Sequence, residues 1–261
     1  MDKKIPMIGT AVVTNTQWVR RLVESVDFPV ENFCIINNNG RGEIDQELDD
    51  IVKSGNTFIS KIHVIHLPSN LGVPASWNLM IKSYMMCPYW VIVNDDVAFC
   101  PGYLEELYEA TTADPVVGVI HGYQGDYGVG SWDNFLIRDH IIQEFGLFDE
   151  NLYPAYNEDA DYIMRFVHRP IKRIAGLKSD YMHGEGKKNE YYVHGSNTGK
   201  SNSDLKTKLD EVNLINIDYL TKKWGPTWRY CRPEPKPKPT RHSTTYTSFD
   251  LNFCRSKHLG F

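Results

Sequence analysis

Two adjacent carboxylates follow a short apolar run near the middle of the chain. The run Trp90-Val91-Ile92-Val93 ends in Asn94-Asp95-Asp96. Such a run is typical of a buried strand, although its length does not exclude a segment of buried helix. Ligands of open α/β sheets bind beyond the carboxyl ends of strands. Paired carboxylates repel each other and resist desolvation, and Mg²⁺ or Mn²⁺ would relieve this. A metal site and a solvated turn are the two interpretations.

Two clusters of polar side chains follow the first two apolar stretches. Thr14-Asn15-Thr16 comes after residues 5–13, and Asn37-Asn38-Asn39-Gly40 comes after Phe33-Cys34-Ile35-Ile36. Such clusters often form turns or helix caps, because these side chains hydrogen-bond the nearby backbone. At the carboxyl end of a strand, the same amides can also hydrogen-bond a ligand such as a nucleobase. Both interpretations stay open on these residues alone.

Three acids open a later helical pattern. Asn157-Glu158-Asp159-Ala160-Asp161 leads into the apolar residues 162–167. Acids in the first turn of a helix complement its dipole, so capping explains this cluster when it is considered alone. His183 follows a later predicted strand, and a lone histidine is more often a packing or surface residue than a ligand.

Apolar stretches and helical patterns alternate along the chain. We predict strands at 5–13, 33–36, 62–67, 90–93, 116–121, 132–137 and 171–175. We predict helices at 17–26, 43–52, 74–84, from 101 onward, at 139–144, around 157–167 and at 204–224. Strand followed by helix four times over favours a parallel sheet with helices on both faces. Pro74 suits a first helical turn, whose N–H groups can bind an anion such as a diphosphate.

The composition fits a cytoplasmic globular protein. The chain has 261 residues, enough for one large α/β domain or two small ones, and a formal net charge of −5. No general attraction to nucleic acid is therefore expected. The five cysteines have no metal-binding spacing, and Cys34 falls in a predicted buried strand, which argues against disulfides. No membrane span or targeting segment is visible.

We predict a single domain over residues 1–231, followed by a linker and tail over 232–261. The stretch RPEPKPKP at 232–239 is typical of an extended linker. The glycine-rich residues 122–130 and the polar residues 185–203 are predicted to be flexible loops.

Taken in order, these motifs resemble those of the family 2 glycosyltransferases with the GT-A fold, over about residues 5–225. The matching residues are Thr14 after the first strand, Asn37-Asn38 after the second, Asn70, Gly72 and Asn78 around a helix start, Asn94-Asp95-Asp96 at the Asp-x-Asp metal motif, Gly146-Leu147-Phe148-Asp149-Glu150 before Glu158-Asp159, and His183. Each motif is weak by itself, and the specificity comes from their order and spacing.

Some residues depart from the family pattern. Asn37 and Asn38 replace the usual carboxylate at the base, Asn94 replaces the first Asp of the metal motif, and Trp77 stands where many relatives have an Arg. These departures affect the identity of the donor more than the class of reaction. The short domain is also similar to glycosyltransferases encoded by large algal viruses, which would place it in a host cytoplasm.

The resemblance implies a metal-dependent, inverting hexosyl- or deoxyhexosyltransferase. The donor would be a nucleotide-diphosphate sugar, with UDP favoured, and the acceptor a hydroxyl of a glycan or glycoprotein. It implies a nucleotide-sugar half over about 1–115 and an acceptor half over 116–231. Mn²⁺ or Mg²⁺ would be held by Asp96 and His183.

The resemblance also assigns the remaining site residues. Asp159 would be the general base, with Glu158 and Asp161 as alternatives that spacing does not distinguish. The donor would be bound by Thr14, Asn15, Asn37, Asn38, Asn78, Asn94 and Asp95.

Two other functions remain open on the sequence. A nucleotidyltransferase commonly has a glycine-rich, basic segment after its first strand, and Thr14-Asn15-Thr16-Gln17 stands there instead. A sugar-nucleotide-binding module without activity is the second alternative, and the amide replacements favour it. Slow release of nucleoside diphosphate from a donor would separate an enzyme from such a module.

Overall fold

The computed structural model describes residues 3–124, 130–187, 203–226, 228, 250, 253, 254, 256 and 257. Most of the predicted linker and tail, and parts of the predicted loops at 122–130 and 185–203, lie outside these residues. Within the described residues, no helix has both the length and the apolar composition needed to cross a membrane.

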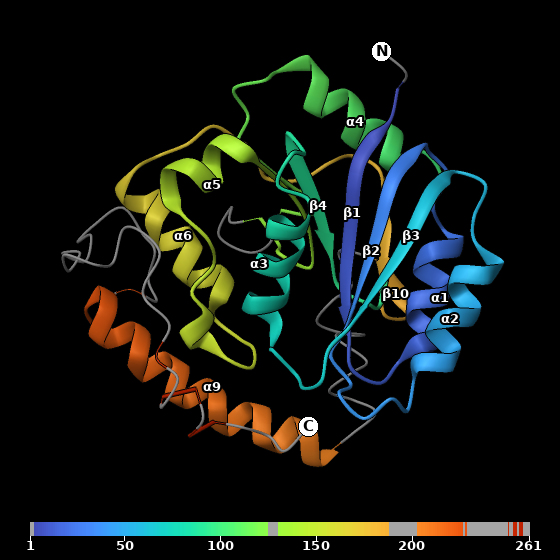
Figure 1. The fold of residues 1–261 in the computed structure, drawn as a ribbon. Coiled ribbons are helices and arrows are strands. Elements are labelled where there is room, and N and C mark those ends of the chain that lie inside the picture. Colours follow the sequence, from blue (N-terminus) through green and yellow to red (C-terminus); the bar gives the residue numbers. More distant parts are fainter. Residues whose placement is uncertain are drawn as a thin grey trace.

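A seven-stranded sheet in the order β3-β2-β1-β4-β7-β6-β8 runs through the centre of the molecule (Figure 1). Its strands are β1 Ile5–Val12, β2 Val30–Asn37, β3 Ile59–His66, β4 Tyr89–Val93, β6 Val119–His121, β7 Asn134–Arg138 and β8 Arg173–Ile174. β7 runs antiparallel to β4 and β6, and the other paired strands run parallel. The predicted mostly parallel sheet is confirmed.

Helices cover both faces of this sheet, as predicted. They are α1 Thr16–Glu24, α2 Asp45–Ser54, α3 Val73–Ser83, α4 Tyr103–Ala113, α5 Asp139–Phe145 and α6 Glu158–His168. Residues of α1, α2 and α4 join the apolar cluster on one face, and residues of α3, α5 and α6 join the cluster on the other. Figure 1 shows α1 and α2 on one side of β1–β3, with α3, α5 and α6 on the opposite side.

The central strands are apolar because both of their faces are buried. In β2, Phe33 and Ile35 belong to one apolar cluster, whereas Cys34 and Ile36 belong to the other. Successive side chains of a strand point to opposite faces, so a doubly covered strand requires apolar residues at consecutive positions. This explains why continuous apolar runs in the sequence located the strands.

The direction of β7 has a consequence for the site. Asn134 at the start of β7 pairs with Val93 at the end of β4. The residues that precede β7 therefore lie beside the residues that follow β4, at the edge of the sheet where the parallel strands end. The backbone N–H of Asn94 donates to the carbonyl oxygen of Asp133 across this edge, at 2.7 Å.

A small second sheet, in the order β10-β9-β5, extends from this edge. It contains β5 Val97–Phe99, β9 Tyr181–His183 and β10 Gly186–Lys187. In the antiparallel pairing of β5 with β9, Val97 is the partner of His183. The Gly184 N–H also donates to the carbonyl oxygen of Asp96 at 2.8 Å. This pairing places His183 next to Asp96.

The long helix α9 Ser203–Trp224 packs against α6 and the 3₁₀ helix η2 Glu150–Leu152. Lys223 of α9 bridges Asp149 and Asp161 in the interior, at 2.7 Å from each. The last described residues return to the same region, where the Lys257 ammonium donates to Asn216 Oδ1 at 2.8 Å.

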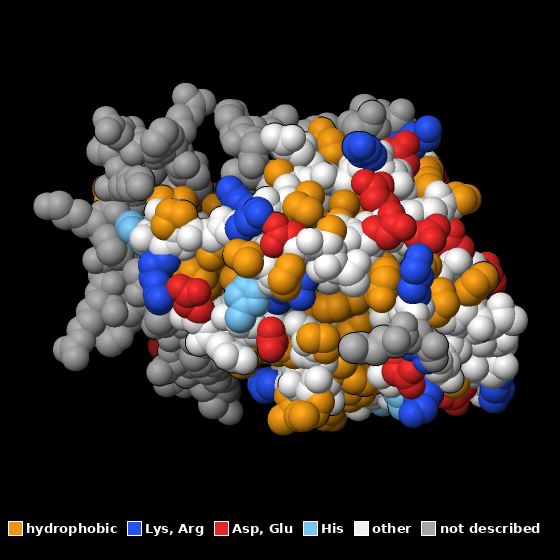
Figure 2. Space-filling model, turned by 90° about the horizontal axis from the view of Figure 1, so that it is seen from above, with side chains coloured by type: hydrophobic (Ala, Val, Ile, Leu, Met, Phe, Trp, Pro, Cys, Tyr) orange, Lys and Arg blue, Asp and Glu red, His pale blue; other side chains and the backbone are white. Residues whose placement is uncertain are grey.

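The opposite edge of the sheet, where the parallel strands begin, has a mixed surface. Figure 2 views this edge from above and shows hydrophobic, acidic and basic side chains interspersed. Among the exposed apolar side chains in the described part of the chain, Met86 is 92% exposed in the turn that leads into β4. The acids and amides singled out in the sequence gather at the other edge.

Candidate active site

The Asn94-Asp95-Asp96 segment leaves β4 at the carboxyl edge of the sheet, as predicted. Asn94 and Asp95 line a cavity, whereas Asp96 is only 1% exposed and lies beside His183. Burial, and then the neighbouring charge of Asp96, raise the pKa of Asp95 to about 8. The two carboxylates therefore differ in position, one facing the cavity and the other facing a histidine.

His183 lies between two carboxylates. Its Nε2 is 3.2 Å from Asp96 Oδ1, and its Nδ1 is 3.1 Å from Asp133 Oδ2. Burial by itself would lower the pKa of His183, but the hydrogen bonds and charges of Asp133 and Asp96 raise it to about 10. Each ring nitrogen of His183 thus faces one oxygen of a different carboxylate.

Asp133 is a site residue that the sequence analysis missed. It accepts hydrogen bonds from the Ser131 hydroxyl and, at 2.7 Å, from the Tyr181 hydroxyl. Burial opposes its ionisation, but the hydrogen bond from His183 leads the contacts that lower its pKa overall. Its position within a predicted strand gave no signal of function, because that strand was not expected to run antiparallel.

Glu158 and Asp159 form the first turn of α6 and line the same cavity. Burial and the neighbouring Asp159 raise the pKa of Glu158 to about 8, and burial also raises the pKa of Asp159. Glu158 is 8% exposed, and its Oε2 has no hydrogen-bond partner in the described part of the chain. Two neighbouring acids with raised pKa values in a cavity are typical of a functional site.

The backbone before these acids is in an unusual conformation. Tyr156 and Asn157 have positive φ angles of 75° and 73°. Asn tolerates this region, but it is uncommon for a bulky residue such as Tyr. Backbone of this kind clusters at functional sites. Here it leads the chain past the mouth of the cavity and into α6.

Asp161, a predicted alternative for the base, does not line the cavity. It accepts from Arg165 Nη2 at 2.6 Å, from Trp224 Nε1 at 2.8 Å, and from Lys223 Nζ at 2.7 Å. Burial favours the neutral acid, but the charges of Lys223 and Arg165 lower the pKa of Asp161 overall. Asp161 thus joins α6 to α9, and its oxygens are occupied by this network.

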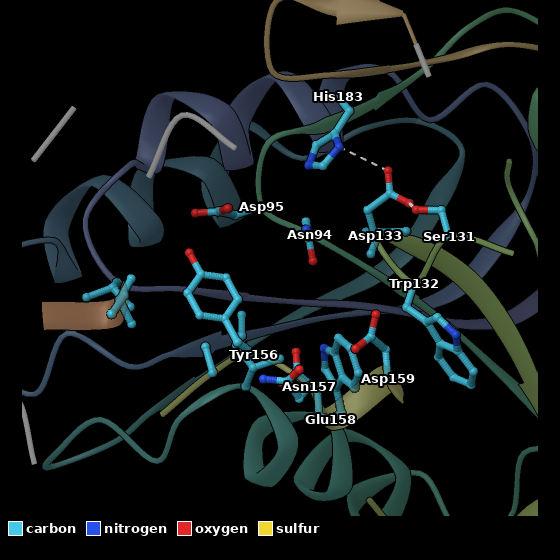
Figure 3. Close-up of a pocket in the computed structure, with 17 residues that line it drawn as sticks. Asn94, Asp95, Ser131, Trp132, Asp133, Tyr156, Asn157, Glu158, Asp159 and His183 are labelled. Atoms are coloured by element: carbon cyan, nitrogen blue, oxygen red, sulfur yellow. Dashed lines mark hydrogen bonds and ion pairs between the residues drawn. The ribbon is translucent and has the colours of Figure 1, made fainter. Parts of the chain in front are cut away.

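The cavity has a volume of about 380 Å³. Figure 3 shows Glu158 and Asp159 across the cavity from Asp95 and His183, with Tyr156 between them. Its lining residues are Ala11, Val13, Val73, Trp77, Val93, Asn94, Asp95, Ser131, Trp132, Asp133, Ala155, Tyr156, Asn157, Glu158, Asp159, His183 and Leu209. The two acidic clusters that the sequence separates therefore share a cavity.

Asn37 and Asn38, which were predicted to bind the sugar donor, form hydrogen bonds within the protein. Asn37 Nδ2 donates to Asp45 Oδ1 at 2.7 Å, and its side-chain oxygen accepts from the Asn39 N–H at 2.9 Å. Asn38 Nδ2 donates to Ser76 Oγ at 2.8 Å. These contacts shape the turn after β2 and tie it to α3, so the turn interpretation describes both residues.

The other predicted donor residues divide into two groups. Asn78 is buried and bonds both backbone groups of Phe148 and the Glu150 carboxylate, so it fastens α3 to the segment before η2. Thr14 is exposed at the end of β1, and Asn15 is the N-cap residue of α1. The Asn15 Nδ2 is buried and has no hydrogen-bond partner among the described residues.

The side chains at the carboxyl edge of the sheet include a pair that could bind a divalent cation. Among the residues that the structure describes, no group of three or more His, Cys, Asp or Glu side chains is arranged to hold a metal ion. Asp96 and His183 nevertheless present an oxygen and a nitrogen to the same place. Mg²⁺ and Mn²⁺ commonly keep several positions for water and substrate phosphates, so a pair of protein ligands suffices, and the imidazole favours Mn²⁺.

The mostly parallel sheet and the helical layers on its two faces match the GT-A fold of solved glycosyltransferases. A family model described as Glycosyl transferase family 2 matches residues 15–163, which is more than half of the chain. The chain therefore belongs to glycosyl transferase family 2. The matched residues include Asn94-Asp95-Asp96 and Glu158-Asp159 and end before His183.

A curated relative and two solved structures show the range of similar proteins. A galactofuranosyl glycosyltransferase of Leishmania donovani is 21% identical over 246 residues, covering 70% of this chain and 57% of that protein. A mannosyltransferase from Pyrobaculum calidifontis, solved with GDP-Man and Mn²⁺, has a TM-score of 0.55 at 10% identity and covers 66% and 54% of the two chains. TarS 1–349 from S. aureus with UDP-GlcNAc has a TM-score of 0.51 at 13% identity, covering 68% and 58%.

At such identities the solved structures establish the fold and leave substrates open. The chain spans little more than half the length of these relatives. The residues of the site must therefore be assigned from its own geometry.

Proposed function

We propose that this protein transfers a hexosyl or deoxyhexosyl group from a nucleotide-diphosphate sugar to a hydroxyl of a glycan or glycoprotein. The observation that supports it is the cavity shared by Asp95 and His183 on one side and Glu158 and Asp159 on the other. A donor diphosphate at the first pair and an acceptor hydroxyl at the second would place the anomeric carbon between them. Attack opposite the leaving group inverts that carbon.

Asp96 and His183 would hold the proposed cation, Mn²⁺ or Mg²⁺, which would supply Lewis-acid neutralisation of the charge on the departing nucleoside diphosphate. Asp96 and His183 are held ready for this role by the pairing of β5 with β9. Asp95 faces the cavity and is assigned to the ribose or the transferred sugar, beside Asn94.

We assign the general base to Asp159, and the burial of the pair supports this choice. Two adjacent acids in a cavity share their protons as a pair. Glu158 has an oxygen that is buried without a partner, so its neutral form is favoured. Asp159 Oδ1 accepts the Ala160 N–H at 2.7 Å, which stabilises a negative charge on Asp159. Asp159 is then the ionised member that takes the acceptor proton.

The donor side is assigned to the ends of β1 and α3. Ala11, Val13, Val73 and Trp77 form an apolar wall of the cavity, and Asn15, whose Nδ2 has no hydrogen-bond partner among the described residues, follows Val13 by two positions at the start of α1. Of the residues implied by the family pattern, Thr14 and Asn15 are retained here, while Asn37, Asn38 and Asn78 hold the scaffold. UDP stays our preferred nucleotide, supported by the UDP complexes of TarS.

A donor panel tests this function. Purified protein is incubated with UDP-, GDP- and dTDP-sugars in Mn²⁺, and release of nucleoside diphosphate is measured without acceptor. We expect release from a UDP-sugar, loss of release in EDTA, and loss in Asp96→Ala. Asp49→Ala, which changes an exposed acid of α2, is the matched control and should retain release.

Other outcomes would change the conclusion. A thermal shift with donor but no release from any donor would favour a binding module without activity. Release of pyrophosphate from a nucleoside triphosphate and a sugar phosphate would favour a nucleotidyltransferase. Equal release with and without a divalent cation would remove the metal from the proposal.

A further inference from the structure

Asp133 takes no part in the proposed reaction, yet several hydrogen bonds hold it in the site. It precedes β7, and its backbone carbonyl accepts the Asn94 N–H at 2.7 Å. Its carboxylate accepts hydrogen bonds from Ser131 and Tyr181. Figure 3 shows the Asp133 carboxylate between Ser131 and His183, with dashed lines to both. Contacts therefore fix both the backbone and the carboxylate of Asp133 at the edge of the cavity.

The two nitrogens of His183 face different acids. Nδ1 is 3.1 Å from Asp133 Oδ2, and Nε2 is 3.2 Å from Asp96 Oδ1. The two nitrogens of an imidazole point away from each other. A cation bound by Nε2 would lie on the side of Asp96, and the ring would separate it from Asp133. Asp133 can therefore orient the ring without sharing the cation.

We propose that Asp133 is a positioning residue for the metal ligand His183. By accepting the Nδ1–H of His183, it selects the tautomer with the lone pair on Nε2 and fixes the plane of the ring. It thereby presents Nε2, together with Asp96 Oδ1, to a divalent cation. This inference rests on the proposed metal site, because it explains how that site is prepared.

The contacts around Asp133 supply the rigidity that this role requires. The Tyr181 hydroxyl donates to Asp133 Oδ2, the same oxygen that faces His183 Nδ1. Tyr181 and His183 both belong to β9, so the strand that holds the histidine also holds its acceptor in place. Carboxylates that accept from a metal-bound histidine commonly change metal affinity 10–100-fold when they are removed.

The first measurement is the affinity for Mn²⁺ itself. Free Mn²⁺ is followed by electron paramagnetic resonance in titrations of the full chain, with and without UDP. We expect Asp133→Ala to bind Mn²⁺ about 10–100-fold more weakly than the unchanged protein. Asp133→Asn keeps an acceptor oxygen and should lose less. Tyr181→Phe removes one contact to Asp133 and should also lose less than Asp133→Ala.

A double-mutant comparison separates positioning from direct coordination. If Asp133 acts through the ring, Asp133→Ala should add nothing in a His183→Ala background. If Asp133→Ala weakens Mn²⁺ binding equally with His183 present and with His183→Ala, then Asp133 acts independently of His183 and the inference is wrong. Melting temperatures of all variants are compared, so that a loss of folding is not taken for a loss of affinity.

The tautomer of His183 is a second measurement, and it would not depend on Asp133 if that residue only stabilised the fold. Long-range ¹H–¹⁵N spectra of the ¹⁵N-labelled protein with Mg²⁺ and UDP report which nitrogen of His183 has the proton. We expect an Nδ1–H signal that is retained in Asp133→Asn; a proton on Nε2 in the unchanged, Mg²⁺-bound protein would overturn the inference.

The outcomes also distinguish this inference from the proposed function. If the unchanged protein fails to bind Mn²⁺ with UDP, the metal site itself is wrong. If it binds Mn²⁺ and Asp133→Ala binds equally well, the metal site stands and the role of Asp133 is wrong.

Discussion

At the scale of single residues, we propose that the acid pair of α6 divides into a member that keeps a proton, Glu158, and a member that accepts one, Asp159. Glu158 and Asp159 are neighbours in the sequence, but an oxygen of Glu158 is buried without a partner, whereas Asp159 accepts a backbone N–H. Sequence spacing does not distinguish the two acids. Their different surroundings do, because a buried oxygen with no hydrogen-bond partner among the described residues favours the neutral form of Glu158.

This difference predicts the effect of two isosteric substitutions. Asp159→Asn should lower kcat about 10²–10⁴-fold, because a general base contributes that much, and should leave the affinity for donor unchanged. Glu158→Gln keeps a neutral hydrogen-bonding group and should lower kcat much less. Steady-state transfer and donor titrations check both variants. Normal turnover in Asp159→Asn together with a collapse in Glu158→Gln would exchange the two assignments.

At the scale of elements, α6 is held in place by a buried ionic network with α9. Asp161 of α6 contacts Arg165, Lys223 and Trp224, and Lys223 also contacts Asp149. Asp149 belongs to the Gly-Leu-Phe-Asp-Glu run that contributed to the family resemblance. Asp149 therefore has a structural role, since its contacts with Lys223 and Tyr219 join this run to α9.

Adjacent lysines of α9 provide a test of this network. Lys223 is 5% exposed and pairs with two buried carboxylates, whereas Lys222 is 75% exposed and pairs with Asp218. Lys223→Met should lower the free energy of unfolding by about 3–5 kcal/mol, because it removes the cation that the buried carboxylates of Asp149 and Asp161 share. Lys222→Met should change it by less than about 1 kcal/mol. Urea unfolding measures both, and equal losses would contradict a structural role for the network.

At the scale of the whole molecule, the site is formed by elements that lie far apart in the chain. The ends of β1 and β4 provide one wall of the cavity, and the first turn of α6 with Leu209 of α9 provides another. The structure must therefore bury acids that would be ionised in water. That arrangement costs stability, and the cost depends on pH.

The pH dependence of folding should show this cost. Glu158 has a pKa of about 8 in the folded protein, raised from 4.5 by burial and by Asp159. Below about pH 4.5, Glu158 is neutral in both states. Between 4.5 and 8 it releases its proton only when unfolded, so stability falls as pH rises. The difference in the free energy of unfolding between Glu158→Gln and the unchanged protein should therefore shift by about 1–3 kcal/mol in favour of Glu158→Gln as the pH rises from 5 to 8.

Unfolding in urea at the two pH values, with EDTA present, checks this prediction. Glu47→Gln, on the exposed surface of α2, removes the same charge without burial and should show no such gain. A constant difference between Glu158→Gln and the unchanged protein at both pH values would mean that Glu158 is ionised in the fold.

The sequence by itself determined the elements and their alternation. Consecutive apolar residues in β1, β2 and β4 are required by burial on both faces, so the pattern alone predicts a covered, mostly parallel sheet. It also predicted that Asn94-Asp95-Asp96 would emerge at the carboxyl edge, because a strand end is a local feature. The order of the motifs predicted the glycosyltransferase family.

Only the tertiary structure decided which of these side chains face the cavity. Asn37, Asn38, Asn78 and Asp161 were predicted at the site, but each has polar contacts with side chains or backbone of other elements, and these contacts hold it in the scaffold. Asp133 was missed because only the antiparallel direction of β7 brings it to the edge where β4 ends. Strand direction and side-chain partners depend on contacts between residues far apart in the chain, and local patterns do not record such contacts.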